Sequence, residues 1–215
     1  MGGGDVSMTT VGRWSPNKVR ARVLDGTWAS PPEELGGMVL LTPTSIAYTG
    51  TSASIGANGS VEFTAVTSLE LRGVFSADYD NYMIAMTAIT TGNDSQYWFQ
   101  LLSGTTPATG TDYTHQYLVG DGSTVGGGRT TSDTSARLAA GGNVARGGDV
   151  IYFYGPYLTQ PTAMRNVSAQ NRSGGIRILD NAATHSLSTS YDGFNWTIIS
   201  NTTTGLISVY GLVGA

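Results

Sequence analysis

The chain has 215 residues, of which only 12% are charged, and it contains no cysteine. An ordinary soluble domain carries about 25% charged residues, so Ser, Thr, Asn and Gly supply most of the polarity here. The formal net charge of −4 argues against a nucleic-acid-binding protein, which needs a basic face to displace counterions. The lack of cysteine excludes disulfides, thiolate nucleophiles and cysteine zinc sites.

The first part of the chain differs from the rest. Residues 1–45 hold four of the seven prolines, and four of the eleven basic residues fall within the first 22 positions. This basic cluster would either bind an acidic surface of a partner or belong to a solvated arm. We expect residues 1–57 to form an extended N-terminal arm that attaches to other proteins of an assembly. The candidate attachment residues are Arg13, Trp14, Arg20, Arg22 and Trp28.

The start of the chain shows no export or membrane signal. Met1–Asp5 lacks the basic and apolar regions of a signal peptide, and Met38–Leu41 is too short to span a bilayer. We therefore expect a protein assembled in the cytoplasm of the producing cell, without membrane insertion.

From residue 58 onward the pattern is that of β-strands. Asn58-Gly59 is a turn pair, after which apolar and polar residues alternate from Val61 to Arg72. No window of ten or more residues has a capped helical period. The sequence therefore predicts an all-β, jelly-roll-like β-sandwich over residues 58–215. Further strands are expected at 82–86, 97–102, 112–119, 134–139, 149–155, 163–170, 176–179, 183–189, 193–199 and 205–212.

Catalytic patterns are missing from the sequence. His115 and His185 stand in no metal-binding spacing, and no serine lies in a G-x-S-x-G elbow. A glycosidase needs two carboxylates facing each other across a cleft. Glu62 and Glu70 are instead expected on the solvent-exposed face of the predicted β-structure. Asp78 and Asp80 are expected to shape a turn through side-chain hydrogen bonds, with a calcium site as the alternative. We predict no enzymatic activity, no metal and no cofactor.

Two features suggest a binding surface. The glycine-rich stretch 120–133 is expected to form a long loop that carries Asp121 and Arg129. Tyr113, His115 and Tyr117 share one strand face, as Tyr152 and Tyr154 do elsewhere, which suits sugar stacking, a protein interface or ordinary packing between sheets or subunits. The candidate receptor-binding residues are Tyr113, His115, Tyr117, Asp121 and Arg129. Trp196, Phe194 and Ile198 are expected in the core.

Four short sequence segments, taken in this order, resemble those of a known protein family. They are VFSADYDNY at 74–82, NVSAQN at 166–171, SYDGF at 190–194 and GLISVYG at 205–211. Over residues 58–215 the chain resembles the β-rich C-terminal domain of tailed-bacteriophage virion proteins of the minor tail, tail fibre or head fibre type. The resemblance implies a trimeric structural protein of the virion that touches the host envelope, and it brings no catalytic residues. It does not cover residues 1–57.

From the resemblance and the composition together we expect a phage tail-fibre or spike-type protein, located in the virion and assembled in the host cytoplasm. A homotrimer would display the sandwich head to a host cell-surface glycan or envelope protein. Other virion proteins would bind the arm, and nucleic acid would not be a partner. The alternatives are a non-adhesive head fibre or capsid decoration protein, a polysaccharide depolymerase, and a lectin-like domain unrelated to phage.

Overall fold

The computed structural model describes residues 37–92 and 95–213, and this part of the chain contains strands and no helix. Fourteen strands join in one antiparallel sheet. They are β1 (Met38–Leu41), β2 (Ser45–Ile55), β3 (Val61–Arg72), β4 (Asn81–Thr90), β5 (Gln96–Ser103), β6 (Thr106–Pro107), β7 (Tyr113–Asp121), β8 (Thr124–Asp133), β9 (Ala136–Ala140), β10 (Ala145–Tyr154), β11 (Thr162–Arg172), β12 (Gly175–His185), β13 (Gly193–Ile198) and β14 (Thr203–Leu212).

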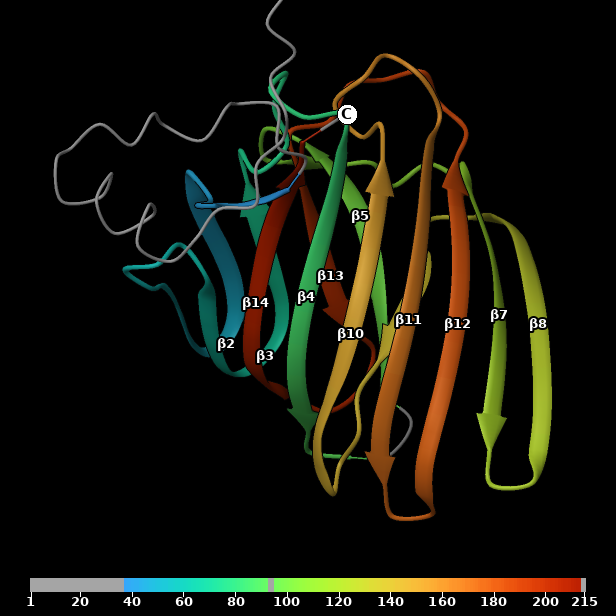
Figure 1. Ribbon diagram of the computed structural model, residues 1–215. Helices are drawn as coiled ribbons and strands as arrows, with labels where there is room; N and C mark the ends of the chain where they lie inside the picture. Colours follow the sequence, from blue (N-terminus) through green and yellow to red (C-terminus); the bar gives the residue numbers. More distant parts are fainter. Residues whose placement is uncertain (1–36, 93–94, 214–215) are drawn as a thin grey trace, which may run out of the picture. The chain divides into compact units, whose positions relative to one another are not determined.

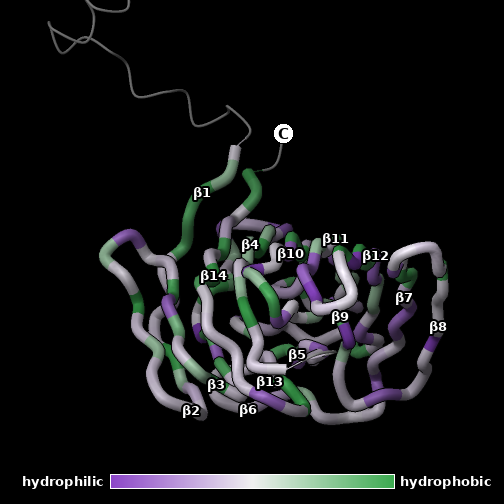
Figure 2. The backbone as a smooth tube through the Cα atoms, turned by 90° about the horizontal axis from the view of Figure 1, so that it is seen from below, coloured by the Kyte–Doolittle hydropathy of each residue, from purple (hydrophilic) through white to green (hydrophobic). Residues whose placement is uncertain are grey.

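The sheet folds over itself into two layers (Figures 1 and 2). The front sheet has the order β14-β4-β10-β11-β12-β7-β8, and the back sheet contains β2, β3, β13, β5 and β6. The layers are continuous because β14 pairs with β3 from Thr203 to Ile207 and with β1 from Val209 to Leu212. This two-layer arrangement confirms the predicted all-β, jelly-roll-like sandwich.

Aromatic side chains fill the space between the layers. The ring of Phe75 lies 5.5 Å from that of Phe153 and 5.9 Å from that of Phe194. Trp196 meets Phe63 edge to face at 5.5 Å. Trp196 and Phe194 are fully buried and Ile198 is 6% exposed, which confirms the prediction that they belong to the core.

The short strand β9 lies between the layers (Figure 2). One of its edges pairs with β5, and inward-facing amide side chains of the front sheet bond to its carbonyl groups. The Nδ2 of Asn166 donates to the Leu138 carbonyl at 2.6 Å, and Asn181 donates to the same oxygen. Gln170 donates to the Ala140 carbonyl at 2.5 Å. These side chains thus provide hydrogen bonds that a neighbouring strand would otherwise supply.

On β11 the usual arrangement of buried apolar and exposed polar residues is inverted, because the amides of Asn166 and Gln170 point inward. In its second half the polar residues Asn166, Ser168 and Gln170 are buried, whereas Val167 and Ala169 are exposed. Successive side chains of a strand point to opposite faces, so inward amides for β9 leave the aliphatic residues on the outside. The outer surface of the front sheet is therefore apolar here.

The structure corrects the predicted start of the head. Strands β1 and β2 lie in residues 38–55, which the sequence pattern assigns to the arm. β2 pairs with β3 along its length, and the predicted Asn58-Gly59 turn joins the two, with Gly59 donating to the Gly56 carbonyl at 2.9 Å. The head thus includes β1 and β2. The candidate attachment residues Arg13, Trp14, Arg20, Arg22 and Trp28 lie outside the described residues.

Two other expectations about strands were wrong. Residues 120–133 form most of the β7–β8 hairpin rather than a long loop. Its two-residue turn places Gly122 at a φ of +60°, as a type II′ turn requires at its first central position. The stretches 176–179 and 183–189 belong to the single strand β12 up to His185. Residues 37–92 and 95–213 contain no helical segment that could span a bilayer.

Candidate binding face

The register of the front sheet aligns outward-facing residues in rows that cross several strands. The pairings Ala85–Val150, Val150–Val167, Val167–Asp180 and Asp180–Leu118 make one row. The pairings Thr87–Gly148, Gly148–Ala169, Ala169–Ile178, Ile178–Gly120 and Gly120–Val125 make the next. We call these two rows, with Leu206, Ser208 and Ile176, the apolar face.

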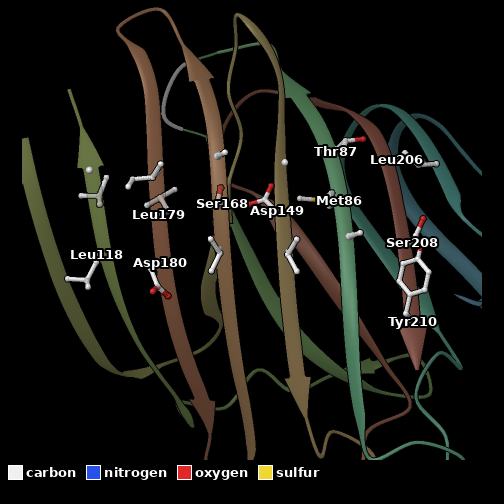
Figure 3. Close-up of a pocket in the computed structure, with 18 of the residues that line it drawn as sticks. Met86, Thr87, Leu118, Asp149, Ser168, Leu179, Asp180, Leu206, Ser208 and Tyr210 are labelled. Atoms are coloured by element: carbon white, nitrogen blue, oxygen red, sulfur yellow. The ribbon is translucent and has the colours of Figure 1, made fainter. Parts of the chain in front are cut away.

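Large aliphatic side chains are unusually exposed on the apolar face. Val167 is 53% exposed, Ile178 is 61% exposed and Val125 is 83% exposed. They border an open hollow of about 990 Å³ that crosses β14, β4, β10, β11, β12 and β7 (Figure 3). Small residues form its floor, including Gly148 and Ala169. A contiguous exposed apolar patch of this kind marks an interaction site in many soluble proteins.

Charge is scarce on this surface. Among the outward-facing side chains that line the hollow, in the part of the chain described, Asp180 is the only charged one. Its carboxylate accepts hydrogen bonds from the guanidinium of Arg165, at 3.2 Å from Nε and 2.8 Å from Nη2. Both side chains remain about half exposed, so the pair contributes little to stability. It does leave the face without an uncompensated charge.

Tyrosines lie on the same outer surface, next to the hollow. The rings of Tyr152 and Tyr154 are nearly parallel, with an interplanar angle of 13° and centroids 6.2 Å apart. Register pairs Tyr152 with Met83 and Met83 with Tyr210, which lines the hollow. Tyr154 is 41% exposed. The sequence correctly placed Tyr152 and Tyr154 on one strand face, and the structure shows that this face is the outer one.

A buried carboxyl group lies on the opposite, inner side of β10. Asp149 is 3% exposed and accepts hydrogen bonds from Asn166, Ser168 and the backbone of Ala140. Burial raises the pKa of this carboxyl group to about 7, although the hydrogen bonds act in the other direction. Asp149 is among the residues that line the hollow (Figure 3), but its carboxyl group is buried and hydrogen-bonded in the polar interior that holds β9.

Two of the predicted receptor-binding residues are interior, which corrects the prediction for them. Tyr113 is fully buried, its hydroxyl accepts a hydrogen bond from the Leu101 amide at 2.9 Å, and its ring lies 4.5 Å from that of His185. His115 is 2% exposed and packs edge to face against Trp98. Burial lowers the pKa of His115, against the opposing effect of Asp133. Neither side chain can contact a receptor in this structure.

The other three candidates are dispersed. Tyr117 shares the inward face of β7, where the guanidinium of Arg137 lies 4.2 Å from its ring centroid. Asp121 lies at the end of the β7–β8 hairpin and accepts a hydrogen bond from Arg172 at 2.8 Å. Arg129 is exposed on β8. The five residues therefore form no single site, and a role for Asp121 or Arg129 in binding stays a prediction.

The turn at residues 76–81 is held by its own side chains. Ser76 donates to the carboxylate of Asp78 at 3.1 Å, and the Asp78 amide donates back to the Ser76 hydroxyl at 3.3 Å. The hydroxyl of Tyr82 donates to the backbone of Ser76 at 2.8 Å. Within the described ranges no three His, Cys, Asp or Glu residues are grouped so that they could hold a metal ion. The turn-shaping role expected for Asp78 is thus the one seen.

Comparison with known proteins gives little. No family model matches the chain, and no curated protein matches it. Among solved structures the chain is similar to a seed lectin isoform of Lotus tetragonolobus, with 10% sequence identity and a TM-score of 0.25. That match covers 83% of this chain and 100% of the lectin chain. At this TM-score the likeness carries no argument about function.

Proposed function

We propose that this chain is a bacteriophage virion structural protein of the tail-fibre or spike type, whose sandwich head is displayed as a homotrimer for binding to the host surface. The observation that carries the proposal is the pair of parallel, partly exposed tyrosine rings, Tyr152 and Tyr154, on the outer surface of the front sheet. The pair lies beside the hollow shown in Figure 3. Such a surface makes contacts and holds no set of reacting groups. The sequence resemblance over residues 58–215 supports the same function.

The tyrosine end of this surface suits a glycan. A parallel pair of partly exposed rings offers apolar faces for sugar rings to stack on, with hydroxyl groups at their edges. Arg165 pairs in register with Tyr152 on the next strand and can donate to a sugar hydroxyl or an acidic group. A contact of this size is weak in one head, and three linked heads would raise the avidity.

A second function is favoured by the composition of the hollow. Its outward-facing lining is mostly aliphatic, and an aliphatic surface is more typical of contact between proteins than of glycan binding. A non-adhesive head fibre or capsid decoration protein would use such a surface for packing in the particle. We keep this function as the alternative, and a polysaccharide depolymerase as a third that finds no support in the geometry.

Binding of the full chain to bacterial cells tests the proposal. Fluorescently labelled wild type should be retained by at least one strain of a panel of Gram-negative and Gram-positive bacteria. Tyr154→Ala should reduce retention about tenfold, because removing one stacking ring from each of several linked heads weakens every attachment point at once. Tyr48→Ala is the matched control, because Tyr48 is 44% exposed but lies on β2 in the back sheet.

Two results would count against adhesion. Wild type retained by no strain would favour the head-fibre or decoration alternative, and this would be strengthened by binding to phage capsids. Equal retention of Tyr154→Ala and Tyr48→Ala would remove the tyrosine pair from the binding site. New reducing ends in host polysaccharide incubated with the protein would point to a depolymerase instead.

A further inference from the structure

We propose that the apolar face is a contact between copies of this chain, in which the ridge of one copy fills the hollow of the next. The ridge consists of Leu118, Val125, Ile176 and Ile178, and the hollow floor of Ala85, Gly148 and Ala169. The inference rests on the proposed function only in that a displayed head is a homo-oligomer. It goes further by naming the surface that joins the copies.

The shape of the face fits a second copy because it carries both complementary halves. Ile178 and Val125 project from β12 and β8, being 61% and 83% exposed. On β10, by contrast, a Cβ atom placed on Gly148 would meet no atom within 4 Å, so the space above the floor is open. A symmetric assembly requires each subunit to present both sides of its contact. An unrelated protein partner would need only one of them.

The apolar area is close to what a stable homo-oligomer needs. Leu118, Val125, Val150, Val167, Ile176 and Ile178 are between 37% and 83% exposed. If a fully exposed aliphatic side chain presents about 100 Å² of apolar surface, these six present on the order of 400 Å². A standard interface covers about 800 Å² on each partner, of which about 65% is apolar in homodimers. The six side chains therefore supply most of the apolar part.

The charges on the face permit its burial. Arg165 and Asp180 satisfy each other within one chain, at 2.8 Å, so covering them leaves neither unpaired. A glycan would need more polar groups than the hollow offers, since Asp180 is the only outward-facing charged residue in the described lining. The chemistry of the face thus favours a protein occupant.

The edge strand next to the ridge gives a second reason for a covering copy. β8 ends the front sheet and pairs with β7 alone among the described strands. The features that commonly protect an edge strand, a charged side chain and a register shift, lie in the second half of β8, at Arg129 and between Thr130 and Asp133. The first half, from Thr124 to Gly128, has neither. A subunit whose hollow takes up Val125 would also lie over this first half of the edge.

The test is the mass of the full chain in solution, measured by light scattering over a hundredfold range of concentration. Wild type should have a mass of two or more times the 22.4 kDa of one chain, and a threefold mass would agree with the expected homotrimer. Ile178→Glu, which places a charge on the ridge, should weaken association at least tenfold. Gly148→Leu, which fills the hollow, should do the same. Ile199→Glu is the matched control, because Ile199 is 74% exposed and lies outside the face.

Mixing the two variants tests whether the ridge really meets the hollow. Ile178→Glu keeps an intact hollow and Gly148→Leu keeps an intact ridge, so an equimolar mixture should associate more strongly than either variant alone. Near-ultraviolet circular dichroism confirms that each variant is folded, and the exposed position of Ile178 makes that variant informative if Gly148→Leu does not fold.

Monomeric wild type at every concentration would overturn the inference, as would a mass of both variants equal to that of Ile199→Glu. Monomeric wild type that still binds cells would contradict the homotrimer but leave host-surface binding intact, and loss of that binding in Ile178→Glu would assign the face to the receptor. An oligomer that binds no cells would support the inference while contradicting adhesion.

Discussion

Replacing Asp149 by Asn should make the free energy of unfolding less dependent on pH. The wild-type side chain is buried, and the pKa of its carboxyl group is about 7 in the folded protein against 3.8 for the unperturbed group. Between these two values the folded protein binds a proton that the unfolded chain does not. The contribution of Asp149 to stability is therefore fully present below pH 3.8 and is lost as the pH rises through about 7. The amide of the Asp149→Asn variant carries no charge at any pH and escapes this loss.

The size of the effect follows from the two pKa values. Each pH unit between them costs about 1.4 kcal/mol, so the wild type loses about 4 kcal/mol in total. Between pH 5 and pH 8 the wild type should lose roughly 2–3 kcal/mol of this stability. The free energy of unfolding of Asp149→Asn minus that of wild type should thus rise by this amount. The amide also changes the hydrogen bonds with Ser168 and Asn166, but that cost is the same at every pH.

Guanidinium denaturation followed by tryptophan fluorescence at pH 5, 6, 7 and 8 measures this difference. Burial lowers the pKa values of His115 and His185, so these groups make the stability rise with pH as they lose protons on the acid side of 6.5. Both proteins contain them, and their effect cancels in the difference. A difference that stays constant within about 0.5 kcal/mol from pH 5 to pH 8 would refute the reasoning.

Three further changes and one control test the packing. Trp196→Ala should lower the free energy of unfolding by about 3–5 kcal/mol in guanidinium denaturation, because the side chain is fully buried between the sheets. Asn181→Ala removes a donor to the Leu138 carbonyl and should cost about 1–2 kcal/mol, with faster hydrogen exchange in β9 by mass spectrometry and unchanged exchange in β13. Gly205→Ala would place a Cβ 2.2 Å from the backbone oxygen of Thr87 and should cost at least about 2 kcal/mol, whereas Gly148→Ala meets no atom and should stay within about 0.5 kcal/mol of wild type in the same assay.

Alternation of apolar and polar residues was enough to predict most of the fold. The alternation identified β3 and the other well-buried strands, because each has one buried apolar face toward the core. It failed for β2, which was assigned to the arm. Most of Ser45–Ile55 is exposed, since β2 is an outer strand that pairs with β3 alone in the described structure, and its Ser, Thr, Ala and Gly residues show little contrast. A strand that buries few side chains needs no alternation of apolar and polar residues, so its sequence does not reveal it.

Strand β7 was predicted at 112–119, but its hairpin partner β8 was missed because the glycines of 120–133 indicated a loop. In the structure two of these glycines allow close approach instead. A Cβ on Gly127 would lie 2.8 Å from the backbone oxygen of Tyr117, and one on Gly128 would lie 2.8 Å from the hydroxyl of Tyr117. The same chemistry that suggests flexibility thus serves contact with a neighbouring aromatic residue.

The candidate site was harder to predict, because period two shows which residues share a face but not which face is inside. Tyr113 and His115 share a face and were placed outside, although they are buried. On β11 the usual expectation is reversed, since Asn166 points inward and Val167 outward. The reason is β9, whose carbonyl groups take hydrogen bonds from the front sheet and whose presence between the layers no local pattern reveals.

On β11 the polar interior and the apolar exterior are linked, because the amides of Asn166 and Gln170 turn inward to hold β9 and alternation then places Val167 on the outer face. On β10 and β12 the same alternation places Val150 and Ile178 outward, beside inward residues that are not amides. If those outer positions faced only water, polar residues there would cost nothing, yet Val150, Val167 and Ile178 occupy them. Val150→Thr, Val167→Thr and Ile178→Thr together should then leave the stability of an isolated head nearly unchanged while weakening its association with other copies. A large loss of stability in a monomeric head would instead show that these side chains serve the fold.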